Sequence, residues 1–124
     1  MSNVSLFKNF TAGAAIAAFR LVKLSAADTV VPAAAATDSL IGVNGDVAPA
    51  LGERCDVALS GISFVEAGAA VALGAMVTSD ALGRCVTAAP ALGANVRVIG
   101  VALEAATAAG DVIRVMLQTG VMQG

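Results

Sequence analysis

Two segments of this chain carry nearly the same pattern of residues. Six residues that begin at Ile41 recur without a gap 58 residues later: Ile41, Gly42, Val43, Gly52, Val57 and Leu59 return as Ile99, Gly100, Val101, Gly110, Val115 and Leu117. A second match, shifted by 55 residues, relates AGAAIAAFRLV from Ala12 to AGAAVALGAMV from Ala67. Two units are too few for a solenoid, which needs about three repeats or more. The repetition therefore predicts a closed fold whose halves, residues 12–61 and 67–120, are related by a pseudo-two-fold axis.

Alternating polar and apolar residues predict β-strands in both halves. In residues 54–60 the side chains of Cys55, Val57 and Leu59 share one face, and residues 112–118 repeat this pattern. Turn-forming residues separate further strand candidates at Arg20–Leu24, Thr29–Val31, Ile41–Val43, Ile62–Val65, Ala75–Thr78, Arg84–Thr87 and Asn95–Ala102. The alanine-rich runs are shorter than the roughly 12 to 15 residues that an isolated helix needs. We therefore expect an all-β fold, a small barrel or sandwich, with short helical turns in the alanine-rich loops.

The composition is that of one small domain with an unusually uncharged surface. The 124 residues are 58% hydrophobic and only 13% charged, and the excess is mostly Ala, Val and Gly. No stretch of about 18 uncharged residues exists, so we expect no membrane helix. Residues 1–10 lack the pattern of a secretory signal, which predicts synthesis in a cytoplasm. The seven basic residues are scattered and the net charge is −2, which argues against nucleic-acid binding.

The chain has few side chains that could carry catalysis. It contains no His, Tyr or Trp, so Ser-His and Cys-His nucleophile pairs and imidazole metal sites cannot be built. Four carboxylates could in principle act as acid and base, but we favour solvated or ion-paired surface positions for all of them: Glu66, Asp80, Glu104 and Asp111. We expect no enzymatic activity, no catalytic residue, no cofactor and no metal.

The two cysteines have a structural interpretation. Cys55 falls where the other half has Ile113, and Cys85 falls where it has Val30. Both are therefore expected to be small core side chains rather than members of a disulfide or reactive thiols.

The N-terminal segment MSNVSLFKNF precedes both repeats. We expect residues 1–10 to be an arm on a single domain of residues 11–124, with a core that closes without the arm. The four apolar side chains of this segment would then contact a neighbouring subunit: Val4, Leu6, Phe7 and Phe10. The alternative is that the segment is a first edge strand of the same domain. A chain with so few charges would also expose apolar patches as a monomer, which predicts an obligate partner.

Four motifs in order carry a resemblance to a known family: TAGAAIAAFRLVKL, LIGVNGDVAPALGERCDVALSGISF, AGAAVALGAMVT and VIGVALEAATAAGDVIRVML. Together they span Thr11 to Leu117, and they resemble the bacteriophage capsid cement, or head decoration, proteins, which are sometimes labelled recombinases. The resemblance implies a small β-rich structural protein, commonly trimeric, that binds the outside of a phage head and stabilises contacts between major capsid subunits. A recombinase would need a nucleotide-binding loop or a basic groove, and the sequence has neither.

The resemblance also implies partners and a location. The partners would be the major capsid protein and further copies of the chain as a homotrimer, on the surface of a virion assembled in the host cytoplasm. A second hypothesis is a small β binding module of a phage fibre or adhesin that recognises a carbohydrate or protein. Such modules normally present exposed aromatic rings for stacking, so the absence of Trp and Tyr disfavours this alternative.

Overall fold

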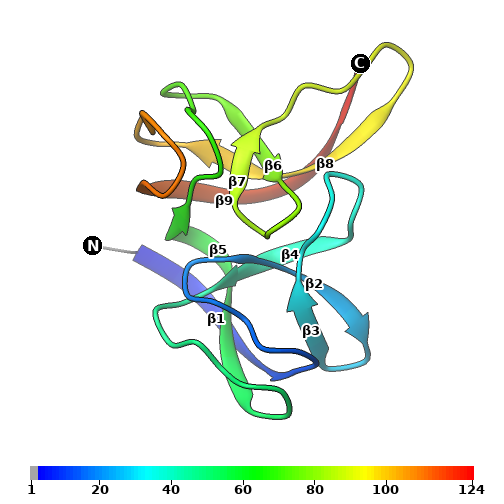
Figure 1. Ribbon diagram of the computed structural model, residues 1–124, viewed down its shortest axis with the longest axis vertical. Helices are drawn as coiled ribbons and strands as arrows, with labels where there is room; N and C mark the ends of the chain where they lie inside the picture. Colours follow the sequence, from blue (N-terminus) through cyan, green and yellow to red (C-terminus); the bar gives the residue numbers. More distant parts are fainter. Residues whose placement is uncertain (1–2) are drawn as a thin grey trace.

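The computed structural model describes residues 3–124, which form nine β-strands and no helix (Figure 1). Within this range, accordingly, there is no helix that could cross a membrane. The alanine-rich segments form turns and bends between strands. The strands are β1 (Asn3–Ala12), β2 (Leu21–Ala26), β3 (Thr29–Pro32), β4 (Leu40–Asn44), β5 (Arg54–Glu66), β6 (Met76–Ser79), β7 (Cys85–Thr87), β8 (Asn95–Ala102) and β9 (Val112–Gln123). The prediction of an all-β fold is confirmed.

Strands β1 to β5 close into a five-stranded barrel, which we call the N-terminal lobe. The strand order is β1-β3-β2-β4-β5, and β5 returns to pair with β1. Only the contact of β1 with β3 is parallel, and it joins Ala12 to Val30. Apolar side chains fill the interior: Phe10, Ala12, Ile16, Val22, Val30, Cys55 and Val57, with Ile41 and Leu59 packed against them.

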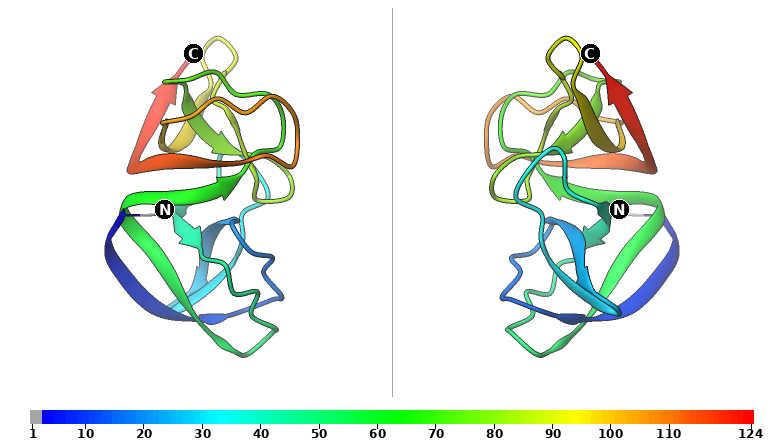
Figure 2. Two further views of the ribbon diagram at one scale, coloured as in Figure 1. Left: turned by 90° about the vertical axis from the view of Figure 1, so that its left-hand side faces the viewer. Right: turned by 90° about the vertical axis from the view of Figure 1, so that its right-hand side faces the viewer.

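The second half of the chain repeats this barrel, and β5 belongs to both. In the C-terminal lobe the order is β5-β9-β8-β6-β7, and a parallel bridge from Ala67 to Cys85 joins the two ends. This bridge is the counterpart of the parallel contact between Ala12 and Val30. The two lobes are stacked along the long axis of the molecule, with β5 and β9 running across its middle (Figure 2).

The register of the strands repeats along with their order. Val101 lies opposite Met116 in the pairing of β8 with β9, as Val43 lies opposite Ala58 in the pairing of β4 with β5. The interior side chains of the N-terminal lobe also recur one for one in the C-terminal core, as Val65, Ala67, Val71, Val77, Cys85, Ile113, Val115, Ile99 and Leu117. The predicted internal duplication is therefore confirmed, and both cysteines are free, buried core residues. The two halves meet head to tail rather than about the expected two-fold axis, because Val43 is buried between the lobes whereas its counterpart Val101 is only half-buried.

The segment expected as an arm lies inside the sheet. Residues 3–12 form β1, which pairs with β5 from Asn3 opposite Ile62 to Thr11 opposite Arg54, and residues 1–2 lie outside the described range. Phe10 and Ala12 are buried in the N-terminal core, so this core includes the segment. The reason is that the barrel closes through β1, whose two neighbours, β5 and β3, lie far from it in sequence.

An apolar contact and a cluster of charges hold the two lobes together. Leu21, Val43 and Ala58 point away from the N-terminal interior and are buried in one cluster with the C-terminal core. Beside this contact the Arg20 guanidinium lies 3.2 Å from a Glu66 carboxylate oxygen. Arg84 lies 3.9 Å from the same oxygen and 3.1 Å from Asp80. Glu66 and Asp80 are thus ion-paired, as expected.

Candidate functional site

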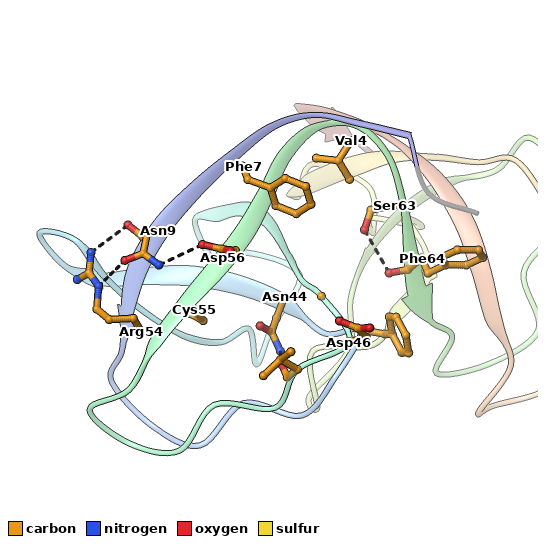
Figure 3. A pocket seen from close by; sticks show the side chains of 13 residues that line it. Val4, Phe7, Asn9, Asn44, Asp46, Arg54, Cys55, Asp56, Ser63 and Phe64 are labelled. Carbon is orange, nitrogen blue, oxygen red and sulfur yellow. Dashed lines mark hydrogen bonds between the residues drawn. The ribbon is translucent and has the colours of Figure 1, made fainter.

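A groove with a volume of about 670 Å³ follows β5 where this strand passes from one lobe to the other (Figure 3). Its walls come from β1, from the loop before β2, from the start of the loop after β4, and from β5 itself. Three of the four phenylalanines in the chain line it: Phe7, Phe19 and Phe64. In a chain so poor in aromatic residues, this concentration makes the groove the candidate site.

The aromatic wall is built from residues of both lobes. The rings of Phe19 and Phe64 pack edge to face, with centroids 6.4 Å apart. Phe19 has a φ of 59°, in the left-handed region that side chains other than glycine rarely adopt, and its counterpart Gly74 has a φ of 82°. The amide of Phe19 donates a hydrogen bond of 3.0 Å to the carbonyl oxygen of Gly45, which helps to hold this conformation. The fold therefore keeps a strained aromatic residue at the groove.

The opposite wall is polar. The Asn9 amide donates to Asp56 over 3.1 Å, and the Arg54 guanidinium donates to Asn9 and, over 2.7 Å, to the hydroxyl of Thr11. Asn44, which is buried, fixes the base of the groove, because its side-chain amide donates to the carbonyl oxygens of Ala17 and Val47 at 2.9 and 3.0 Å. The groove thus combines an apolar wall with an exposed network of donors and acceptors.

The structure separates the four N-terminal residues that sequence reasoning singled out. Val4 and Phe7 both line the groove, and Leu6 and Phe7 are each 53% exposed. Phe10 is only 5% exposed and belongs to the core of the N-terminal lobe. Lys8 lies over its ring, 4.2 Å from the centroid, and pairs with Asp28 at 2.8 Å. The hydrogen bond from Lys8 holds the pKa of Asp28 below its usual value.

Sequence reasoning missed Phe19 and Phe64 as groove residues. Phe19 lies in a loop and Phe64 near the end of β5, 45 residues apart, and no local pattern brings them together. The only signal in the sequence was the scarcity of aromatic residues, which made each of the four phenylalanines a candidate for a binding surface.

The remaining candidates for chemistry are engaged or buried. Burial raises the pKa of the Cys85 thiol to about 12, and burial also raises the pKa of Cys55. A Glu104 oxygen accepts from the Arg114 guanidinium at 2.8 Å, and an Asp111 oxygen accepts from the Thr107 amide at 2.8 Å. Residues 3–124 contain no group of three acidic, Cys or His side chains placed to hold a metal ion.

Two comparisons with known proteins both lead to proteins of phage heads. The sequence profile described as phage cement protein matches residues 3–117. Among solved structures, the chain is similar to the N base of the head fiber gp8.5 in bacteriophage phi29, with a TM-score of 0.68 and 20% sequence identity over 91% of this chain and 93% of that chain. At this identity the likeness shows a shared fold. No curated protein sequence matches the chain.

Proposed function

The chain belongs to the phage cement protein family, a family of structural proteins of the phage capsid, and we propose that it binds the major capsid protein through the groove side of its N-terminal lobe. Val4, Leu6 and Phe7 are the contact residues in this proposal, while Phe10 supports them from the core. The alternative of a carbohydrate-binding module has less support, because the groove rings of Phe19 and Phe64 pack against each other instead of offering free faces for stacking on a sugar.

One observation carries the proposal: two large apolar side chains, Leu6 and Phe7, stand half exposed on a strand that is fixed in the barrel. Exposed aromatic and aliphatic anchors beside a groove are typical of the energetic centre of an interface. Because β1 is already ordered, binding would cost little additional backbone entropy. Phe7 also lines the groove, so a capsid segment could cover the ring and enter the groove together.

We further propose that the chain acts as a homotrimer on the outer surface of the virion, after assembly in the host cytoplasm. The support is the low charge of the chain and the large apolar side chains exposed on both lobes, among them Leu24 and Met76. Each subunit contact can be weak, because a closed shell multiplies it over many copies. No catalytic residue, cofactor or metal enters this function.

The test is to measure binding of single variants to empty heads of the phage that encodes the chain. Phe7→Ala should weaken binding about tenfold or more, the usual effect of removing an anchor. The matched control is Leu92→Ala, which removes an almost fully exposed apolar side chain from a turn of the C-terminal lobe. Both variants should keep the wild-type melting temperature. Unchanged head binding by Phe7→Ala would refute the assignment of this face to the capsid, and binding of the wild-type chain to a glycan array instead would favour the module.

A further inference from the structure

An apolar row crosses the outside of the C-terminal lobe. Met76 lies opposite Val101, Val101 opposite Met116, and Met116 opposite Ile62, so four side chains from β6, β8, β9 and β5 stand side by side on one face. We call these four residues the outer row. Met76 and Met116 are 42% and 39% exposed, and the other two are half-buried. Within residues 3–124 no segment of the chain covers the row.

The N-terminal lobe has the same row in the same register. There Leu21 lies opposite Val43, Val43 opposite Ala58, and Ala58 opposite Phe7. The first three are completely buried, in one cluster with the interior of the C-terminal lobe. This row is therefore covered by a barrel of the same fold, and Figure 2 shows the C-terminal lobe stacked on the N-terminal lobe.

The barrel end that contacts this row also occurs in both lobes. In the C-terminal lobe the N-terminal lobe covers it, whereas in the N-terminal lobe nothing in the described chain covers it. In the C-terminal lobe Ile99 and Leu117 are buried, whereas their N-terminal counterparts Ile41 and Leu59 are half-buried. Leu24 is 45% exposed, and its counterpart Ser79 only 3%. The N-terminal lobe thus has an uncovered end, which we define by Leu24, Ile41 and Leu59.

We infer that the outer row docks on the uncovered end of a second copy of this chain, so that the contact made inside one molecule is repeated between molecules. The two surfaces are different, so the contact is head to tail and leads to a closed ring or an open chain. This inference refines the proposed self-association and names its surfaces. It does not use the Leu6 and Phe7 face that we assign to the capsid.

The contact between chains is weaker than the one within the chain. The charges that tie the lobes together have no counterparts, because Arg20, Glu66, Asp80 and Arg84 correspond to Ala75, Thr11, Ser25 and Thr29. At the uncovered end, Lys8 and Lys23 stand where the C-terminal lobe has the buried Ser63 and Thr78. Association is therefore expected at high protein concentration in solution, and at the high local concentration of a head surface.

Sedimentation velocity on two variants tests the inference. Met116→Asp places a charge in the outer row and leaves the uncovered end intact, whereas Ile41→Asp does the reverse. The wild-type chain should associate in the range of tens to hundreds of micromolar, roughly the range in which weak contacts form. Each variant alone should remain a monomer. An equimolar mixture of the two should form a one-to-one dimer and nothing larger, because one intact surface of each kind remains.

Several controls keep the result interpretable. Leu92→Asp carries the same charge on an unrelated exposed position and should associate like the wild type. Thermal melts show whether each variant is folded. If Met116→Asp or Ile41→Asp fails to fold, Met76→Asp replaces the first in the outer row and Leu59→Gln replaces the second at the uncovered end. A wild-type chain that stays monomeric, variants that still associate, or a mixture that stays monomeric would each overturn the inference. Loss of head binding by Met116→Asp with unchanged self-association would assign the outer row to the capsid instead.

Discussion

The two lobes have the same interior but different surroundings. Nine core positions of the N-terminal barrel recur in the C-terminal barrel, and the strand registers coincide. Yet Val43 is completely buried while its counterpart Val101 is only half-buried, because one lobe covers the outside of the other and nothing in the described chain covers the second. The pattern of side chains therefore specifies the barrel fold, whereas the contact between the lobes determines which outer face is buried.

Side-chain size follows the same division. At the covered position the N-terminal lobe has Ala58, which lets the two barrels approach, and at the uncovered position the C-terminal lobe has Met116. Methionine is flexible and polarisable and adapts to irregular partners. The difference teaches that the duplicated halves share a fold and have diverged in what they present to other surfaces.

The largest expected effect tests the shared backbone. Gly42 and Gly100 are counterparts, and an added Cβ would fall on the carbonyl oxygen of Ala58 in one lobe and of Met116 in the other. Gly42→Ala and Gly100→Ala should each destabilise the fold by about 3 kcal/mol or more, as overpacking against rigid backbone does. Urea unfolding measures both. If only one of the two variants loses stability, the close approach of strands is not a common feature of the two barrels.

The next largest effect compares equivalent positions in the two lobes. Ile99→Ala removes a completely buried side chain and should cost about 2 to 5 kcal/mol. Ile41→Ala removes the half-buried counterpart and should cost clearly less. The same denaturation curves give both values. Equal losses would mean that the N-terminal end is as well covered as the C-terminal one, and would remove the basis of the uncovered end.

A smaller effect concerns the cysteines. Each occupies the place of a branched aliphatic residue in the other lobe, so Cys55→Val and Cys85→Val should each cost less than about 1.5 kcal/mol. Because burial raises the pKa of Cys85 to about 12, this thiol should not react with a thiol reagent at pH 8 until the chain unfolds. Rapid labelling of Cys85 in the native protein would show that the C-terminal barrel opens readily.

The smallest effect concerns a turn. Asp28 has a φ of 54° where the C-terminal lobe has Gly83 at 76°, so Asp28→Gly relieves a left-handed conformation and loses an exposed ion pair with Lys8. These changes oppose each other, and the melting temperature at pH 7 should hardly move.

Acid should reveal the ion pair that this variant lacks. The pKa of Asp28 is lowered in the folded state, so its contribution to stability is present above the ordinary value of 3.8 and is lost as the pH falls below it. On acidification through this range the wild-type chain should therefore lose more stability than Asp28→Gly. Parallel melts between pH 5 and about pH 3 compare the two proteins, and identical acid dependence would show that the ion pair with Lys8 contributes nothing.

The sequence predicted the duplication, most of the strands and the role of both cysteines, because these depend on local pattern and on identity between the halves. It did not predict that β5 is continuous. Gly61 suggested a break between residues 54–60 and 62–65, and in the structure it adopts a φ of 94° within one long strand. For the same reason β1 had no visible partner in the repeat, since its counterpart is the second part of β5.

The groove and the outer row were beyond prediction from the sequence alone. The groove depends on Phe19 and Phe64 meeting across the lobe junction, and the outer row depends on which barrel face stays uncovered. Both are consequences of how the lobes stack. Apolar alternation places Val43 and Val101 on equivalent strand faces and contains no information about their different burial.

The sharing of β5 also has a consequence for how the chain reaches its native state. All strands of the N-terminal barrel lie before Ala67, so this barrel can close while the rest of the chain is still being synthesised. Its last strand then offers a finished edge on which β9 pairs, which lowers the entropic cost of closing the second barrel. Melting of the N-terminal barrel would free β5 from its partners there, and melting of the C-terminal barrel would expose Leu21, Val43 and Ala58 to water. We therefore expect the finished chain to unfold in a single cooperative transition, even though its first barrel can close before the second is synthesised.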